Sequence, residues 1–133
     1  MIRGTTAQFR FKIPYMKSEL AWANIKFWQN NNPNKLLPIK KTLENCGNPD
    51  ESMELCVSLT AEETARFSDK YKAVVQLRAL HIPSGTVFGT TPTQVPVYPM
   101  SDDMLGEDDI ILPEENDEGF IVLDGDIIRD NMY

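Results

Sequence analysis

The chain has 133 residues, of which 41% are hydrophobic and 25% are charged, and its formal net charge at pH 7 is −7. This length and composition indicate one ordinary domain, or a smaller domain with a tail, and they exclude a chain that is disordered throughout. No apolar run approaches the ~20 residues of a membrane span, and residues 1–14 lack the apolar stretch of a secretory signal.

The charge is divided unevenly along the chain. Residues 101–133 hold twelve acidic residues and one basic residue, a net charge of −11, whereas residues 1–100 hold eight acidic and twelve basic residues and carry +4. Such a split predicts that the acidic segment meets a basic surface, on its own body or on a partner. It disfavours nucleic acid as the main ligand, because the body is only mildly basic and the acidic segment repels phosphates.

The first two strands are predicted from a period-two alternation of apolar residues. Residues 8–13 alternate up to a proline, and residues 20–29 alternate again. We expect one face of the second strand to be buried, namely Ala21, Ala23, Ile25 and Phe27. The other face holds Trp22, Asn24, Lys26 and Trp28, with the two tryptophans at the margins of the core.

Turn residues divide the rest of the body into further short strands. Residues 36–43 predict a strand at a sheet edge, because Pro38 cannot donate to a ladder. The stretch from Thr60 to Glu63 has the shape of a capping box and predicts a single helical turn. The remaining strands are expected at residues 53–59, 71–82, 86–90 and 93–97.

About seven short strands with frequent turns indicate an all-β fold, and the economical architecture is an immunoglobulin-like two-sheet sandwich. An α/β fold is disfavoured because no long amphipathic helix is present to connect parallel strands. We predict that residues 1–98 form the sandwich and that residues 99–133 form an extended acidic C-terminal arm. Three prolines mark the exit from the body: Pro92, Pro96 and Pro99.

The arm contains apolar islands that a purely solvating acidic tail would lack. The stronger islands comprise Ile110, Ile111 and Leu112, and then Phe120, Ile121, Val122 and Leu123; a weaker one follows at Ile127 and Ile128. They have the character of short strands that need a sheet edge or a groove. We predict that the two stronger islands bind protein, and that Phe120 to Leu123 adds as a strand to the sheet edge of a neighbour.

Residues suited to catalysis are sparse. Cys46 and Cys56 are expected to be reduced thiols, since a disulfide would need an oxidising compartment, and with one histidine they do not make a four-ligand zinc site. His81 stands near the end of a strand, and Ser84 lies in the next turn without a nucleophile motif, so we expect a structural histidine. No catalytic residue and no cofactor is predicted, and an enzyme is disfavoured.

The acidic clusters of the arm raise the question of calcium. With Gly119 at the sixth position of an EF-hand loop, Glu114, Asn116 and Glu118 take the first, third and fifth positions. The twelfth position, where a bidentate glutamate is expected, is then Gly125. The pattern fails at its most informative position, so a simple turn is the better interpretation and no metal site is predicted.

Four short stretches carry a resemblance to a known family. They are Arg3-Gly4-Thr5-Thr6 leading into Phe9 and Phe11, Ala23 to Phe27, Val57 to Thr64, and Val74 to Arg78. Their order and spacing resemble the small immunoglobulin-like domains of tailed-bacteriophage structural proteins, in particular the N-terminal domain of the phage upper baseplate protein family. The resemblance covers about residues 3–97 and brings no catalytic residues. This chain departs from the family pattern because the acidic arm stands in place of a long fibre or receptor-binding region.

The resemblance implies a non-enzymatic structural protein of a bacteriophage particle, made in the host cytoplasm and built into the virion. It would serve as a head decoration, as a connector or neck protein, or as a tail, baseplate or fibre-anchoring component. Its partners would be other virion structural proteins, in a multi-copy or homo-oligomeric assembly, with neither nucleic acid nor membrane as a partner. The alternative is a carbohydrate- or calcium-dependent adhesion module, which predicts stabilisation by calcium.

Overall fold

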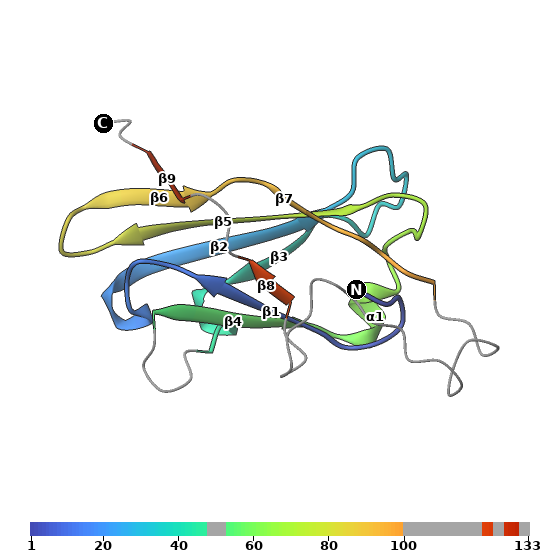
Figure 1. Ribbon diagram of the computed structural model, residues 1–133, viewed down its shortest axis with the longest axis horizontal. Helices are drawn as coiled ribbons and strands as arrows, with labels where there is room; N and C mark the ends of the chain where they lie inside the picture. Colours follow the sequence, from blue (N-terminus) through green and yellow to red (C-terminus); the bar gives the residue numbers. More distant parts are fainter. Residues whose placement is uncertain (48–52, 100–120, 124–126, 131–133) are drawn as a thin grey trace.

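The computed structural model describes residues 1–47, 53–99, 121–123 and 127–130. These residues form two β-sheets that pack face to face (Figure 1). The prediction of an all-β two-sheet sandwich is therefore confirmed. Within the described ranges, no helix is long and apolar enough to cross a membrane.

The smaller sheet has the order β4-β1-β8. Strand β1 (Ala7–Lys12) pairs antiparallel with β4 (Glu54–Leu59), and Phe9 lies opposite Val57. On its other side, β1 pairs in parallel with β8 (Ile121–Leu123). The N-terminal strand therefore lies between a strand from the middle of the chain and a strand from the C-terminal arm.

The larger sheet has the order β3-β2-β5-β6-β9, and β7 also pairs with β5. All of these pairings are antiparallel. Its strands are β2 (Leu20–Trp28), β3 (Ile39–Thr42), β5 (Ala73–His81), β6 (Thr86–Thr90), β7 (Thr93–Val95) and β9 (Ile127–Asp130). Three single-turn helices accompany them, η1 (Lys17–Glu19), η2 (Leu43–Asn45) and α1 (Ala61–Thr64).

The strand order accounts for the immunoglobulin-like sequence pattern. Strands β1 and β4 correspond to the paired B and E strands of an immunoglobulin sandwich, and β3, β2, β5 and β6 correspond to strands C′, C, F and G. In that fold a strand A precedes strand B and lies beside it. Here β1 is the first strand along the chain, and the place beside it holds β8 from the arm.

Alternation along the strands places large apolar side chains between the sheets. Phe9 of the smaller sheet and Phe27 of the larger sheet are both buried, and their ring centroids are 5.0 Å apart. The inward face predicted for β2 is buried except at Ala21. A register shift between Leu20 and Trp22 exposes Ala21 and buries Leu20 instead, so the prediction was wrong at this one position.

Strand β3 is the edge strand that the sequence predicted. It pairs with β2 alone and begins at Ile39, directly after the cis peptide bond between Leu37 and Pro38. Pro38 thus precedes the strand and takes no part in its ladder, as expected for a residue without an N–H group.

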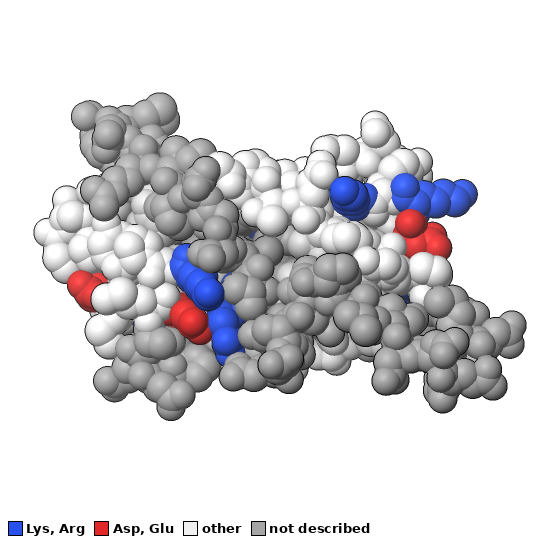
Figure 2. All heavy atoms as spheres, viewed as in Figure 1, with Lys and Arg blue, Asp and Glu red and all other residues white. Residues whose placement is uncertain are grey.

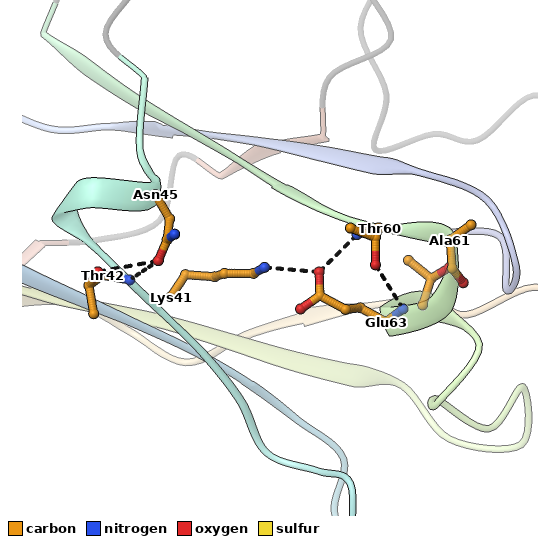
Figure 3. Close-up of polar contacts among 7 residues, drawn as sticks. Lys41, Thr42, Asn45, Thr60, Ala61 and Glu63 are labelled. Carbon is orange, nitrogen blue, oxygen red and sulfur yellow. Dashed lines mark hydrogen bonds and ion pairs between the residues drawn. The ribbon is translucent and has the colours of Figure 1, made fainter.

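An ion pair joins β3 of the larger sheet to the helix that follows β4 (Figure 3). Lys41 Nζ lies 2.9 Å from Glu63 Oε1, which also accepts a hydrogen bond from the Thr60 N–H. Thr60 Oγ1 in turn accepts from the Glu63 N–H, which confirms the predicted capping box. Burial acts to raise the pKa of Glu63, but the hydrogen bonds from Thr60 and Lys41 and the Lys41 charge outweigh it and hold this pKa below its ordinary value.

Candidate functional site

The arm residues predicted to bind protein lie only partly within the described structure. Ile110, Ile111, Leu112 and Phe120 fall outside the described residues. Ile121 to Leu123 forms β8 and pairs with β1 of the same chain, with Ile121 opposite Phe9. The Ile121 side chain is 1% exposed and belongs to the hydrophobic core. This island therefore completes the smaller sheet of its own chain, and its binding to a neighbour remains a prediction.

The second described piece of the arm lies on the other sheet. Strand β9 pairs antiparallel with β6, with Arg129 opposite Phe88. An open sheet edge presents unpaired N–H and C=O groups and invites pairing with other chains. The two arm strands thus cover one edge of each sheet, and Figure 1 shows them on the same side of the sandwich.

The outward surface of the larger sheet carries an ordered set of basic, amide and aromatic side chains. We call this surface the basic face and define it by seven residues: Trp22, Asn24, Lys26, Trp28, Lys40, Gln76 and Arg78. They come from β2, β3 and β5, and the register sets them side by side. Asn24 lies opposite Arg78, and Lys26 lies between Gln76 and Lys40.

Three shallow hollows lie along the basic face. The central one, of about 340 Å³, is lined by the amide and basic members of the face. A hollow of about 420 Å³ reaches Trp22, and another of about 200 Å³ reaches Trp28. Lys26 Nζ lies 4.9 Å from the centre of the Trp28 ring, within the range of a cation–π contact. Both tryptophans of the chain therefore belong to this face.

The charge pattern of the basic face differs from that of other parts of the surface. On the side seen in Figure 2, the described Lys and Arg residues lie in two areas, and each area also holds Asp or Glu residues. Elsewhere, Arg10 pairs with Glu54, and Lys41 pairs with Glu63. The basic face instead holds Lys26 and Lys40, for which the described residues supply no acidic partner, and Glu44 lines the hollow beside Trp22.

His81 forms a polar cluster between the β1–β2 connection and the turn after β5. Its Nδ1 lies 2.7 Å from Ser84 Oγ, and its Nε2 lies 3.2 Å from a carboxylate oxygen of Glu19. The Tyr15 ring stacks on the imidazole with centroids 3.6 Å apart. The hydrogen bond with His81 lowers the pKa of Glu19. The cluster has the residue types of a nucleophile, a base and an orienting acid. The sequence brought His81 and Ser84 into consideration but not Glu19, which is 62 residues from His81.

The surroundings of Ser84 do not support acyl transfer. An oxyanion hole needs backbone N–H groups that are free to bind the developing negative charge. The Gly85 N–H donates to the carbonyls of His81 and Ile82, and the Thr86 N–H donates to Ser84 Oγ. Ser84 also lines none of the three hollows described above. The contacts support the structural role predicted for His81, which ties two connections together.

The two cysteines are free thiols, as the sequence predicted. Cys46 is buried, and burial raises the pKa of its thiol to about 11. In the described ranges, no group of three or more His, Cys, Asp or Glu residues could hold a metal ion. The acidic clusters weighed for calcium, around Glu114 and Glu118, lie outside the described residues.

The described surface thus offers two features for contact with other molecules. One is the C-terminal arm, whose strands β8 and β9 extend the two sheets, and the other is the basic face. Both are built on regular strands, which hold side chains at a fixed spacing. No protein-family model, no curated protein and no solved structure matches the chain.

Proposed function

We propose that the chain is a non-enzymatic structural protein of a bacteriophage particle, which assembles with other virion proteins through its β-sandwich and its C-terminal arm. One observation carries the assembly part of the proposal. The arm returns to the body, and β8 takes the place beside β1 with Ile121 in the core. Strand addition of this kind is a general way to attach a chain segment to a β-sheet.

The attachment of the arm favours a role in assembly. Tyr98 pairs with Ile2, and Ile121 pairs with Phe9, so residues 99–120 begin and end beside the N-terminal part of the chain. These residues include nine of the twelve arm acids and no Lys or Arg. Because both ends are held, the segment loses less conformational entropy on binding a neighbour than a free tail would.

Two observations support the other parts of the proposal. Residues 3–97 resemble the small immunoglobulin-like domains of tailed-bacteriophage structural proteins, and the strand order of the body agrees with that fold class. At the His81 cluster, where catalytic residue types meet within the described residues, a non-enzymatic role is supported because the N–H groups beside Ser84 are already paired. Head decoration, connector or neck, and tail, baseplate or fibre anchoring are the roles open to such a protein.

The proposal is tested on particles released from cells that carry the gene. Particles are purified on a density gradient, washed in high salt and analysed by quantitative mass spectrometry. We expect several copies of this chain in each particle, at a fixed ratio to the major capsid protein. Absence of the chain from washed particles would overturn the proposal.

The contribution of the arm is tested by complementation with two variants. Deletion of residues 101–133 is expected to abolish incorporation, but it also removes Ile121 from the core. A second variant therefore replaces the nine acidic residues of positions 101–118 by Asn and Gln and keeps both arm strands. We expect this variant to match the wild type in thermal stability and to be depleted from particles. Normal incorporation of both variants would contradict a role for the arm.

One observation favours the alternative of a carbohydrate-dependent adhesion module. Two tryptophans and five amide side chains line the hollows of the basic face, and aromatic rings with amides suit a sugar ligand. If the adhesion module depends on calcium, the melting temperature of the chain should be higher in millimolar calcium. Glycan-array binding that disappears in Trp22→Ala and Trp28→Ala variants would favour this alternative, and no binding would remove it.

A further inference from the structure

We propose that the basic face binds the acidic segment, residues 101–118, of a second copy of the chain. The inference rests on the proposed assembly function and names the partner that this face takes. The contact joins the larger sheet of one copy to the arm of another. Carboxylates of the arm bind the lysine, arginine and amide side chains of the sheet.

A like-charge pair lies at the centre of the basic face. Lys26 and Lys40 lie directly opposite each other on β2 and β3, and both side chains are exposed. Like charges at opposed positions destabilise an isolated pair of strands. In the part of the chain that the structure describes, neither lysine has an acidic partner. Arg78 lines the same hollow of about 340 Å³. Carboxylates bound there would relieve this repulsion.

The acidic segment and the basic face are complementary in chemistry. The segment carries nine carboxylates and no Lys or Arg, which complements Lys26 and Lys40 of the face. The segment also contains the apolar island Ile110 to Leu112, and the basic face supplies the rings of Trp22 and Trp28 beside its charges. Asn24 and Gln76 add amide groups that donate hydrogen bonds to carboxylates.

The anchoring of the segment indicates which copy supplies it. In its own chain the segment is held at both ends beside the N-terminal residues, by the Ile2–Tyr98 bridge and by the pairing of Phe9 with Ile121. Phe9 belongs to the smaller sheet. The basic face lies on the outward surface of the larger sheet, since Phe27, which alternates with Lys26 and Trp28, points inward and contacts Phe9. The Phe9–Ile121 anchor and the basic face therefore belong to opposite sheets, which favours the face of another copy.

A contact between two different surfaces of the same chain is heterologous. Repetition of such a contact closes into a ring when the rotation between copies allows it, and otherwise continues as a filament. Both outcomes suit a multi-copy component of a particle. Association through surface charges is also weakened by salt, because exposed ion pairs are screened.

The test measures self-association of the purified full-length chain by sedimentation over a range of concentrations at low ionic strength. The test variant is Lys26→Gln with Lys40→Gln, and the matched control is Lys35→Gln with Lys70→Gln, two exposed lysines outside the basic face. Both variants have the same net charge. We expect the test variant to weaken association about tenfold, since two surface ion pairs are lost, and the control to associate as the wild type does.

A second measurement uses a fluorescein-labelled synthetic peptide of residues 101–118. We expect its fluorescence anisotropy to rise with the wild-type chain and the control variant, and to rise about tenfold more weakly with the test variant. A peptide with Asn and Gln in place of its nine acids should not bind. The tryptophans of the basic face should report wild-type binding through a change in intrinsic fluorescence.

Two results would overturn the inference. One is equal association of the wild type and the test variant. The other is a wild-type chain that stays monomeric at every concentration and does not bind the peptide, while the variant with Asn and Gln in place of its nine acids does bind it. That result would mean that the segment occupies the basic face of its own chain. Absence of the chain from phage particles would remove the proposed function and leave these binding results standing, so the two failures are distinguishable.

Discussion

The Lys41–Glu63 ion pair offers a quantitative test of how the sandwich is held together. The two side chains are 17% and 15% exposed, and the Nζ to Oε1 distance is 2.9 Å. Fully exposed pairs contribute up to about 1 kcal/mol, and breaking a buried pair costs about 3 to 5 kcal/mol. We therefore expect Glu63→Gln to lower the free energy of unfolding by about 1 to 2 kcal/mol, which corresponds to a melting temperature lower by about 4 to 8 °C.

The dependence of this effect on pH follows from the lowered pKa of Glu63. A carboxyl group with a lowered pKa in the folded state stabilises the fold fully above its unfolded pKa, about 4.3, and loses this contribution as the pH falls through the folded pKa. The difference between wild type and Glu63→Gln should therefore be full at pH 7 and should shrink progressively below about pH 4.3.

The assay is urea unfolding monitored by tryptophan fluorescence, at pH 7 and at a pH below about 4.3. The control is Glu62→Gln, which removes the same charge from the same helix at an exposed position. It should change the free energy of unfolding by less than about 0.5 kcal/mol. An equal effect of the two substitutions at pH 7, or a difference that persists unchanged in acid, would refute the reasoning.

Further tests address the arm, the thiols and the absence of catalysis. Ile121→Ala removes a core side chain and should cost about 2 to 4 kcal/mol in unfolding free energy, whereas Ile82→Ala, at a position 58% exposed, should cost less than about 0.5 kcal/mol; equal costs would mean that β8 is not docked. At pH 8, mass spectrometry after iodoacetamide treatment should find Cys56 alkylated before Cys46, whose pKa is about 11, and the reverse order would contradict the burial. Ester hydrolysis measured with p-nitrophenyl acetate should be the same for wild type and Ser84→Ala, and a slower variant would reopen the enzyme hypothesis.

The elements that the sequence predicted well are those set by local pattern. Strands β2 and β5 follow from period-two alternation, and the turn at Thr60 follows from the capping box, because each depends on neighbours within a few residues. The exception within β2 is Ala21. A register shift depends on how the partner strand fits, and alternation along one strand does not reveal it.

The pairings of the arm and the composition of the basic face depend on contacts between distant parts of the chain. Ile121 and Phe9 are more than a hundred residues apart, and nothing local in either stretch specifies their pairing. The sequence placed Lys26 on one face with the two tryptophans, but the position of Lys40 beside it follows only from the register of β3 on β2. Such long-range pairings determine where the arm docks and which residues form the basic face. The sequence pattern therefore predicted the apolar islands but not the strands with which they pair.

The place of the arm in the sandwich depends most on the docking of β8 against β1 within one chain. Amide hydrogen exchange of the purified full-length chain, read by mass spectrometry over a dilution series, tests this pairing directly. We predict that peptides covering Ile121–Leu123 are protected to a degree similar to those covering Ala7–Lys12, and that the protection is unchanged on dilution. Exchange at the rate of an unstructured peptide, or protection that is lost on dilution, would contradict an arm that completes the sandwich of its own chain.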